Sequence, residues 1–321
     1  MTTLVTGSTG LVGSEAIKFF TELGHNVIGI DANMRHEFFD TPDKVPTKTV
    51  DIRDREALAA LFSCHEFEAI IHCAAQPSHD YSKEHVMEDF EINTIGTLNL
   101  LEVARIACPH AVFVHCSTDK IYGEGMNRQG LLEGETRCDS LFPFTETTPI
   151  IAPLTPFGVS KLAADFYVQE YAKQGWLTTG IFRMGCITGR NHEGAEQHGF
   201  LAYLTKCIKE GKTYKIFGYK GKQVRDQIHA HDLVNAFWHF IQHPRSGEVY
   251  NIGGGEERAV SVLEAGQLIA EKLGKEFIYE LHDGRYADRQ WDVHDVSKFR
   301  SHYPKWEYEY SLDDIISDLC S

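Results

Sequence analysis

The chain has 321 residues, 42% of them hydrophobic, so it is long enough to bury a full core and to form one large domain with a smaller one. Its 31 Lys and Arg face 46 Asp and Glu, which gives a formal net charge of −15. A surface this acidic argues against nucleic acid and anionic membranes as partners. An anionic ligand would therefore need a local group of cations.

The eight cysteines lie singly, and none forms a CxxC pair. This usage is typical of reduced thiols in a cytoplasmic protein rather than of a disulfide framework. A strand is expected from residue 2, which argues against a signal peptide, and no apolar run is long enough to cross a bilayer. We therefore expect a cytoplasmic protein without a membrane anchor.

The first 31 residues have the pattern of a dinucleotide-binding unit. An apolar strand runs into the turn GSTGLVG at 7–13, a helix follows, and a second strand ends at Asp31. The glycines of this turn allow a sharp bend, a close approach of backbone to a pyrophosphate, and close helix packing. Asp31 would accept hydrogen bonds from the adenosine ribose and repel a 2′-phosphate, so the sequence predicts NAD rather than NADP. The expected contacts on this side are Gly7, Thr9, Gly10, Leu11, Val12, Gly13, Asp31, Asn33 and Arg35.

Strand and helix signals then alternate, as they do in a doubly wound parallel sheet. Further strands are expected at 47–50, 69–75, 111–116 and 178–184, and helices at about 54–62, 82–107 and 155–174. Residues 124–154 carry Gly, Pro, Thr and acids without periodicity and predict a lid or interface segment. The predicted fold class is α/β, with a Rossmann-type doubly wound sheet.

Shorter elements are expected from about residue 186. They are helices at 199–210, 232–242, 261–273 and 311–319, and strands at 214–217 and 248–252. Several of them would cover the carboxyl ends of the sheet strands, where ligands of such folds bind. We therefore assign residues 1–185 to a NAD-binding domain and residues 186–321 to a substrate domain, parts of which could return to the first.

Four further motifs, taken with the glycine turn, resemble the extended short-chain dehydrogenase/reductase family, in particular its nucleotide-sugar epimerases and dehydratases. They are Asp51-Ile52, HCAAQ at 72–76, STDKIYG at 117–123 and FGVSK at 157–161. GKQVRD at 221–226, NIGG at 251–254 and RYAD at 285–288 also fall where that family places them. The resemblance covers nearly the whole chain and implies NAD as cofactor and a nucleotide-diphosphate sugar as substrate.

The resemblance implies roles for residues at the strand ends. Thr118 would hydrogen-bond the sugar hydroxyl that is oxidised. Lys161 would hold the nicotinamide ribose and supply positive charge near the reacting oxygen. Further cofactor contacts would come from Asp51, Ile52, Cys73, Ala74, Ala75, Asn93 and Ser117.

The chain departs from the family at Phe157. The family motif is YxxxK, in which the phenol takes the proton as hydride leaves carbon. Three explanations stay open: an engineered substitution, a natural variant with another base, and a protein that binds without efficient turnover; we favour the natural variant. The sequence does not choose among the candidate replacement bases, which are Asp119, Cys186, His79 and Lys120.

Residue 120 indicates the reaction type. The 4,6-dehydratases that the chain resembles carry Asp-Glu at positions 119 and 120, and the glutamate removes the C5 proton. Here that glutamate is Lys120, which disfavours elimination. STDKIYG together with GKQVRD looks most like the CDP-paratose (CDP-tyvelose) 2-epimerase branch, which oxidises a sugar hydroxyl with tightly held NAD and returns the hydride to the other face. Alternatives are a UDP- or dTDP-sugar 4-epimerase or 4,6-dehydratase, or a silent protein that binds NAD and a nucleotide sugar.

The nucleotide diphosphate requires cations and an aromatic ring. Arg225 and Arg285 match the family's phosphate-binding arginines, Asp288 would bind a ribose hydroxyl, and Phe217 would stack on the base. Further substrate contacts are expected from Ser78, His79, Thr118, His198, Gly199, Phe200, Lys215 and Ile216.

Two expectations concern metals and assembly. None of the 17 histidines lies in a metal-binding motif, so neither a structural nor a catalytic metal is expected. Family members pair through two long helices, here at about 82–107 and 155–174, so the resemblance implies a homodimer.

Overall fold

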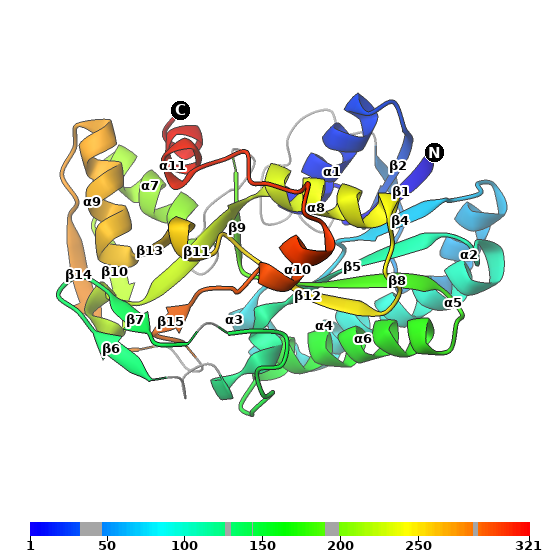
Figure 1. The fold of residues 1–321 in the computed structure, drawn as a ribbon, viewed down its shortest axis with the longest axis horizontal. Helices are drawn as coiled ribbons and strands as arrows, with labels where there is room; N and C mark the ends of the chain where they lie inside the picture. The colour runs from blue at the N-terminus through cyan, green and yellow to red at the C-terminus, as the bar shows by residue number, and fades with distance from the viewer. Residues whose placement is uncertain (33–46, 126–129, 143, 190–198, 285–287) are drawn as a thin grey trace.

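The structure, a computed structural model, describes residues 1–32, 47–125, 130–142, 144–189, 199–284 and 288–321 (Figure 1). A seven-stranded parallel sheet has the order β12-β8-β5-β4-β1-β2-β3. Its strands in chain order are β1 (Thr2–Thr6), β2 (Asn26–Asp31), β3 (Thr47–Thr49), β4 (Ala69–His72), β5 (Val112–Thr118), β8 (Thr178–Met184) and β12 (Glu248–Ile252). This arrangement confirms the predicted Rossmann-type α/β class.

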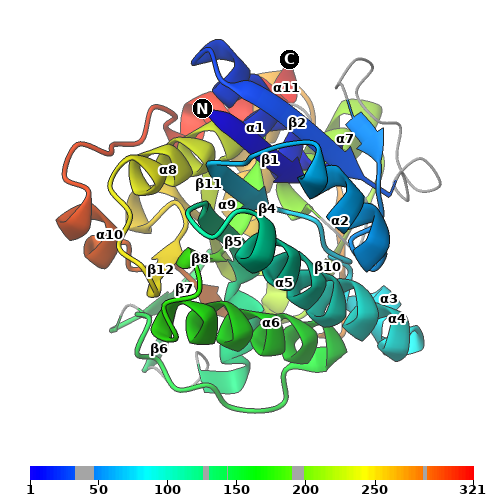
Figure 2. The ribbon, with the colours of Figure 1, turned by 90° about the vertical axis from the view of Figure 1, so that its right-hand side faces the viewer.

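Helices cover both faces of this sheet (Figures 1 and 2). α1 (Leu11–Glu22) and α8 (Ala230–Gln242) pack on one face, and α2 (Arg55–Ser63), α5 (Thr97–Ala107) and α6 (Thr155–Lys173) pack on the other. The central strands β1, β4, β5 and β8 are buried along most of their length because helices cover both faces, whereas the edge strand β3 is largely exposed.

The long helix predicted at 82–107 is divided into shorter elements. They are α3 (His79–Glu84), α4 (Val86–Phe90), the π-helical turn η2 (Glu91–Gly96) and α5. Inside η2, the Asn93 side chain accepts a hydrogen bond from the Gln76 amide, in the segment after β4, and donates one to Ser160 of α6, so this turn connects two other parts of the fold. Such π-helical turns are frequent at functional sites.

A smaller lobe lies beyond the carboxyl ends of the sheet (Figure 1). Its core joins α7 (Phe200–Glu210), α9 (Val262–Leu273) and α11 (Leu312–Cys320) to the parallel pair β10 (Tyr214–Phe217) and β14 (Tyr279–His282). A second small sheet, between the two lobes, contains β9 (Cys186–Thr188), β11 (Val224–His229), β13 (Ala259–Ser261) and β15 (Trp291–Asp292). The remaining elements are η3 (Asp119–Tyr122), the hairpin β6 (Leu131–Glu133) and β7 (Cys138–Ser140), η5 (Tyr219–Gly221), η6 (Glu256–Arg258) and α10 (Ser297–His302).

The sequence did not predict the small sheet, and β11 shows why. All six residues of its sequence VRDQIH are buried, although four of them are polar. The spacing of apolar residues is the main sequence signal for a strand, and in β11 polar residues occupy most of the buried positions. Charged side chains inside this sheet therefore need partners, and they form the candidate site described below.

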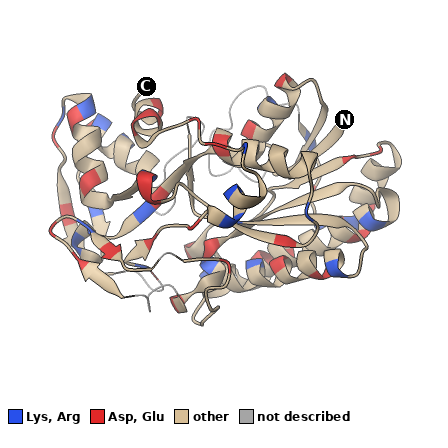
Figure 3. Cartoon of the chain, in the orientation of Figure 1, with Lys and Arg blue, Asp and Glu red and all other residues tan. Residues whose placement is uncertain are grey.

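Acidic side chains are spread over both lobes, with basic side chains among them (Figure 3). The net negative charge is therefore not confined to one region, and an anionic ligand still needs local cations. In the described part of the chain, no helix combines the length and apolarity needed to cross a membrane.

Candidate active site

The glycine turn leaves open backbone at the start of α1. Gly7 has φ +66°, and a Cβ there would lie 2.6 Å from the Ala74 amide nitrogen. A Cβ at Gly13 would overlap the Gly7 carbonyl oxygen. Gly10 is the N-cap of α1 and provides no capping side chain, so the first amides of α1, from Leu11 onward, remain for a ligand. This cradle fits the predicted pyrophosphate of NAD.

Asp31, at the end of β2, contacts the same turn. Its Oδ2 accepts hydrogen bonds from the Thr9 amide at 3.0 Å and the Thr9 hydroxyl at 2.6 Å. The carboxylate therefore lies beside the pyrophosphate cradle, where an adenosine ribose is expected. Two further predicted contacts, Asn33 and Arg35, lie outside the described residues.

Asp51, predicted to meet adenine, is held by Arg53. The Arg53 amide donates to Oδ1 at 2.8 Å, and its guanidinium donates to Oδ2 at 2.7 Å. Partial burial would raise the pKa of Asp51, but the Arg53 bonds outweigh it and lower that pKa. The neighbouring Ile52 is buried against Gly96 of η2.

The end of β4 carries the small residues predicted to lie under the cofactor. The Ala74 amide donates to the Thr6 hydroxyl at 3.1 Å, and the Cys73 sulfur lies 3.5 Å from the Cys116 sulfur. Asn93 is buried, and its Oδ1 accepts from the Gln76 amide at 2.9 Å. Asn93 therefore fixes the backbone just beyond Ala75.

Lys161 lies beside the end of β5. Its Nζ donates to the Cys116 carbonyl at 2.6 Å, and burial lowers the pKa of this amine. The Ser117 hydroxyl donates to Asp165 at 2.7 Å, and Asp165 also receives two hydrogen bonds from Arg183. These contacts fix α6 against β5, so Lys161 lies at the strand end that carries Thr118.

Phe157 is buried in the first turn of α6, and its closest described ring is His79. The two ring centroids are 4.7 Å apart in an edge-to-face arrangement. The His79 Nδ1 lies 3.3 Å from the Thr155 hydroxyl, and the Phe157 amide donates to the Ser82 hydroxyl at 3.2 Å. Ser78 caps α3, which places His79 in the first turn of that helix.

A cluster of charged side chains begins directly after Thr118, and we define it as Asp119, Lys120, Arg289, Asp292 and His294. All of them are buried except Lys120, which is partly exposed. Arg289 joins the two carboxylates, at 2.8 Å from Asp119 and 2.9 Å from Asp292. The Lys120 Nζ lies 3.2 Å from Asp292 and 3.6 Å from Asp119. Asp119 is therefore a buried, ion-paired carboxylate.

The surroundings of two candidate bases disfavour proton uptake. Burial would raise the pKa of Asp119, but Arg289 and Lys120 hold it well below its ordinary value. At the start of β9, desolvation raises the pKa of the Cys186 thiol to about 12. Neither group is suited to accept a proton near neutral pH.

Of the two arginines predicted to bind the diphosphate, the structure describes Arg225, on β11. Arg225 is buried, and its guanidinium donates to Asp288 at 2.7 Å and to the Arg289 carbonyl at 2.8 Å. The other predicted arginine, Arg285, lies outside the described residues, as does His198. A phosphate reaching Arg225 would share it with Asp288.

The predicted base-binding residues lie on β10 and at the start of α7. The Phe217 ring has the His282 ring as a neighbour, with centroids 5.3 Å apart. Lys215 is exposed, whereas the Ile216 side chain is buried, so any contact from Ile216 would involve its backbone. Gly199 caps α7 with φ +74°, and Phe200 is the first residue of that helix.

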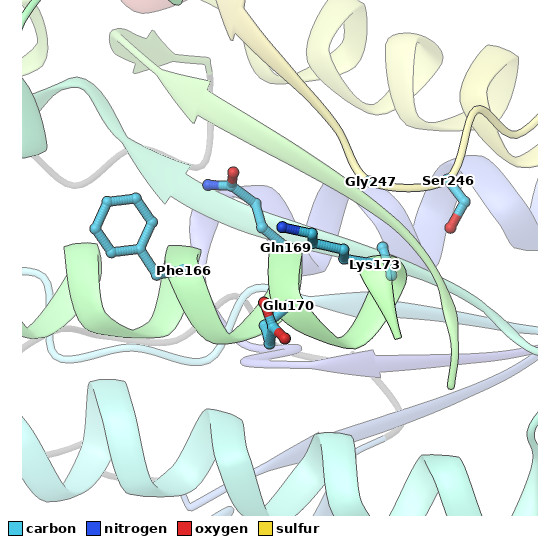
Figure 4. Close-up of a pocket in the computed structure, with 7 residues that line it drawn as sticks. Phe166, Gln169, Glu170, Lys173, Ser246 and Gly247 are labelled. Atoms are coloured by element: carbon cyan, nitrogen blue, oxygen red, sulfur yellow. The ribbon is translucent and has the colours of Figure 1, made fainter. Parts of the chain in front are cut away.

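A surface hollow of about 490 Å³ lies away from these groups (Figure 4). Phe166, Gln169, Glu170 and Lys173 line it from the later turns of α6, together with residues 246–247. Residues 246–247 precede β12, so the hollow is at the amino end of a sheet strand. Ligands of doubly wound sheets bind at the opposite edge, so this hollow is not the predicted site.

Sequence reasoning missed three members of the charge cluster: Arg289, Asp292 and His294. They belong to the segment RQWDVHD, which matches no motif that we used. One signal was present, because charged residues alternate there with apolar ones. That pattern predicts a strand with one polar face, but it does not reveal that β11 buries this face.

The sequence was compared with known proteins. Residues 3–253 match the model of the NAD dependent epimerase/dehydratase family. CDP-paratose 2-epimerase of Salmonella typhi is 29% identical over 314 residues, which cover 93% of this chain and 92% of that protein. UDP-glucose 4-epimerase of Erwinia amylovora is 29% identical, with coverage of 90% and 88%. dTDP-glucose 4,6-dehydratase 1 of Escherichia coli K12 is also 29% identical, with coverage of 90% and 82%.

Solved structures agree with this match. The UDP-glucose 4-epimerase of Thermus thermophilus in complex with NAD superposes with a TM-score of 0.84 at 27% identity, covering 100% of this chain and 98% of that one. The dTDP-glucose 4,6-dehydratase of Bacillus anthracis in complex with NAD gives a TM-score of 0.80 at 25% identity, covering 100% and 95%. The cofactor is therefore NAD, and the chain belongs to the NAD-dependent epimerase/dehydratase family.

Proposed function

We propose that this chain epimerises a nucleotide-activated hexose in the manner of a CDP-sugar 2-epimerase. The observation that carries the proposal is the pairing of Lys120 with Asp292 and Asp119. A cation stands where a 4,6-dehydratase places the glutamate that removes a C5 proton, so this site lacks the base for elimination. The match to the Salmonella typhi CDP-paratose 2-epimerase over 93% of the chain supports the choice of sugar nucleotide.

Different residues at the strand ends would bind the cofactor and position the substrate. Bound NAD supplies a reversible hydride acceptor for one sugar carbon. The glycine turn and Asp31 would hold its pyrophosphate and adenosine ribose, and Lys161 would orient its other ribose. Thr118 positions the hydroxyl of the carbon that is oxidised. As that carbon loses hydride the hydroxyl must lose a proton, and both return when the keto sugar is reduced on its other face.

We assign the proton transfer to His79. The absent phenol of residue 157 would extend from the Phe157 ring, and the His79 ring packs edge-to-face against that ring at 4.7 Å. The contact between Nδ1 and the Thr155 hydroxyl orients the imidazole. Asp119 and Cys186 are disfavoured by their shifted pKa values, and Lys120 is bound to two carboxylates.

The reaction is tested by incubating the purified protein with CDP-, UDP-, dTDP- and GDP-hexoses in D2O and following the sugar protons by NMR. We expect a new epimer of a CDP-hexose that keeps its carbon-bound hydrogen, because hydride leaves and returns within the site. Deuterium at carbon would indicate an enolising route, as in a dehydratase. Saturable binding of a nucleotide sugar without turnover would instead support the silent binding protein.

The role of His79 is tested by His79→Asn, with His85→Asn, at the junction of α3 and α4, as the matched control. His79→Asn should lower kcat by about 10²- to 10⁴-fold, which is the usual contribution of a general base. Bound NAD and the melting temperature should stay unchanged. His85 stacks on Tyr81 away from Phe157, so its variant should retain activity.

Restoring the phenol gives an independent readout. Phe157→Tyr should raise activity little in the native chain but should rescue His79→Asn. The reason is that the restored phenol and the His79 imidazole would each accept the same proton, that of the oxidised sugar hydroxyl. A large gain from Phe157→Tyr alone, with no loss in His79→Asn, would contradict the assignment. It would indicate a site that has lost its base.

We also propose that the chain pairs as a homodimer through α4 and α6. Large apolar side chains are exposed on both helices: Val86, Met87 and Phe90 on α4, and Val159, Phe166 and Tyr167 on α6. α4 and α6 contact each other and share one face of the molecule (Figure 2). Exposed apolar side chains gathered on two contacting helices favour an interaction surface.

A further inference from the structure

His294 lies beside the strand ends that carry the proposed chemistry. In the parallel register of β5 and β8, Thr118 pairs with Met184, and Gly185 follows at once. A Cβ at Gly185 would overlap the His294 ring, and a Cβ at Gly253 would lie 2.6 Å from its Nδ1. The imidazole therefore fills the space that two glycines leave, and one of its nitrogens lies within 4.8 Å of a carboxylate oxygen of Asp119.

The imidazole is fixed in one orientation. Its Nδ1 lies 2.9 Å from Oδ1 of Asp226, and the His294 amide donates to Oδ2 of Asp226 at 3.0 Å. The Phe144 ring packs against it edge-to-face, with centroids 4.4 Å apart. Because Nδ1 is engaged, Nε2 is the atom available to a ligand.

Two buried polar atoms of the cluster lack partners. Among the residues that the structure describes, neither Nε2 of His294 nor Oδ1 of Asp292 has a hydrogen-bond partner. His294 is 3% exposed and Asp292 is 2% exposed, so leaving these atoms unpaired is costly. Asp119, Asp292 and His294 each offer one polar atom within 4.8 Å of the others. An oxygen atom about 2.8 Å from each of two atoms can bond both of them when they are less than about 5.6 Å apart, so one hydroxyl could serve two of these residues.

The charges of the site distinguish a hydroxyl from a metal ion. Asp119, Asp292 and the adjoining Asp226 face Lys120 and Arg289. Arg225 also lies 3.8 Å from Asp292, but it is paired with Asp288, so the group with these two residues still carries one more carboxylate than cations. Burial lowers the pKa of His294, but the Asp226 carboxylate outweighs it and raises that pKa. The proton that this raised pKa favours balances the remaining negative charge, whereas a divalent cation would have to displace that proton and would leave the group with a net positive charge. A hydroxyl is neutral, donates to Oδ1 of Asp292 and accepts from Nε2 of His294.

We propose that Asp292 and His294 form a subsite that recognises one hydroxyl of the substrate's sugar. The inference rests on the proposed function, which it extends by naming a required substrate group. A sugar that lacks this hydroxyl leaves both buried atoms unpaired and is rejected. An internal water offers the same chemistry as a sugar hydroxyl, and the experiment separates the two.

The test uses His294→Asn in the full chain with its NAD. The asparagine amide can replace Nδ1 and keep the bond to Asp226, while Nε2 is removed. We compare kcat/KM for CDP-glucose with that for its monodeoxy analogues at carbons that are not oxidised. The native protein should reject one analogue by about 10³-fold or more. The variant should lose about 10²-fold on CDP-glucose and little on that analogue, so that the discrimination collapses.

His229→Asn is the matched control. His229 is also a buried histidine that faces a carboxylate, 3.5 Å from Asp318, and it lies at the start of α8 outside the cluster. This variant should keep the discrimination of the native protein. Melting temperatures of both variants report on folding separately.

Three results would overturn the subsite. An equal loss on all sugars in His294→Asn, with discrimination intact, would assign the two atoms to an internal water. Equal binding of all monodeoxy analogues by the native protein would also contradict it. Stoichiometric divalent metal in the purified protein, measured by plasma mass spectrometry, would assign the cluster to a cation. Absence of turnover with every sugar would contradict the proposed function instead, and calorimetric binding of the analogues would still test the subsite.

Discussion

At the residue scale, Gly13 shows how one missing methyl group shapes the cofactor cradle. A Cβ at this position would overlap the Gly7 carbonyl oxygen, whereas a Cβ at Gly130 would meet only the Leu141 side chain at 3.4 Å. Backbone cannot yield as a flexible side chain does. The close packing of α1 on the turn therefore depends on glycine at 13.

Gly13→Ala should lower the NAD content of the purified protein at least tenfold and lower its melting temperature, because the turn must open to admit the methyl group. Gly130→Ala should change neither. NAD released by denaturation is measured by absorbance, and melting is followed by fluorescence. Full NAD occupancy in Gly13→Ala would show that the turn is not the pyrophosphate cradle.

The site residues differ in how far the sequence could reveal them. Thr118 and Lys161 belong to motifs whose spacing fixes their position on β5 and α6, and the structure brings them to one sheet edge. Asp292 and His294 become a site only because β15 pairs with β11 and Gly185 leaves space. Such long-range contacts leave no periodic signal in the chain.

At the scale of elements, the accuracy of prediction followed apolar patterning. The strands β8, β10 and β12 begin and end where the sequence predicts, because they are short apolar runs between breakers. The helix expected at 82–107 is interrupted, since polar contacts of Asn93 and the turn η2 override helix propensity. In this segment, contacts with the rest of the fold therefore determine the helix type and the helix boundaries.

The paired strands β4 and β5 carry two buried histidines that make the stability of the fold sensitive to acid. His72 and His115 are paired in the register, with ring centroids 5.4 Å apart, and both are buried. Burial lowers the pKa of His72 to about 3 and lowers that of His115 in the same direction. Below pH 6.5 the unfolded chain binds protons that the folded chain does not, so the free energy of unfolding falls as pH falls toward 3.

His115→Leu should make the protein more resistant to acid. Because of His72 alone, the free energy of unfolding should be about 2 kcal/mol lower at pH 5 than at neutral pH. His115 should lower it further. In the described structure neither ring nitrogen of His115 has a partner, so leucine removes a polar burial cost as well. Urea unfolding at pH 5 and pH 7 measures the gain, with the exposed His110→Asn as control. A loss of stability at pH 5 would contradict the prediction.

At the scale of the whole molecule, the exposed faces of α4 and α6 predict the assembly. Met87 is 69% exposed and Phe166 is 52% exposed. Met87→Glu with Phe166→Glu should convert a dimer into a monomer, because charge opposes burial of that face. Light scattering after size exclusion measures the mass. Leu268→Glu, on α9 of the smaller lobe, should leave the dimer intact.

The two lobes are not consecutive segments of the chain. After the small sheet has begun with β9 and β11, the chain returns to supply α8 and then β12 to the large sheet. β12 pairs with β8 through five residues and forms one edge of that sheet. Rigid placement of Thr118 beside β8 therefore depends on residues far along the chain.

Because β12 comes long after β8 in the chain, β8 is incompletely paired during synthesis. When β8 leaves the ribosome, its outer edge has no partner until roughly 70 further residues have been made, which takes several seconds at typical elongation rates. An unpaired strand edge rich in apolar residues is a template for misassembly with other nascent chains. During those seconds the unpaired edge of β8 must be kept from other chains. We therefore expect β8 to be an early binding site for chaperones that recognise extended apolar segments.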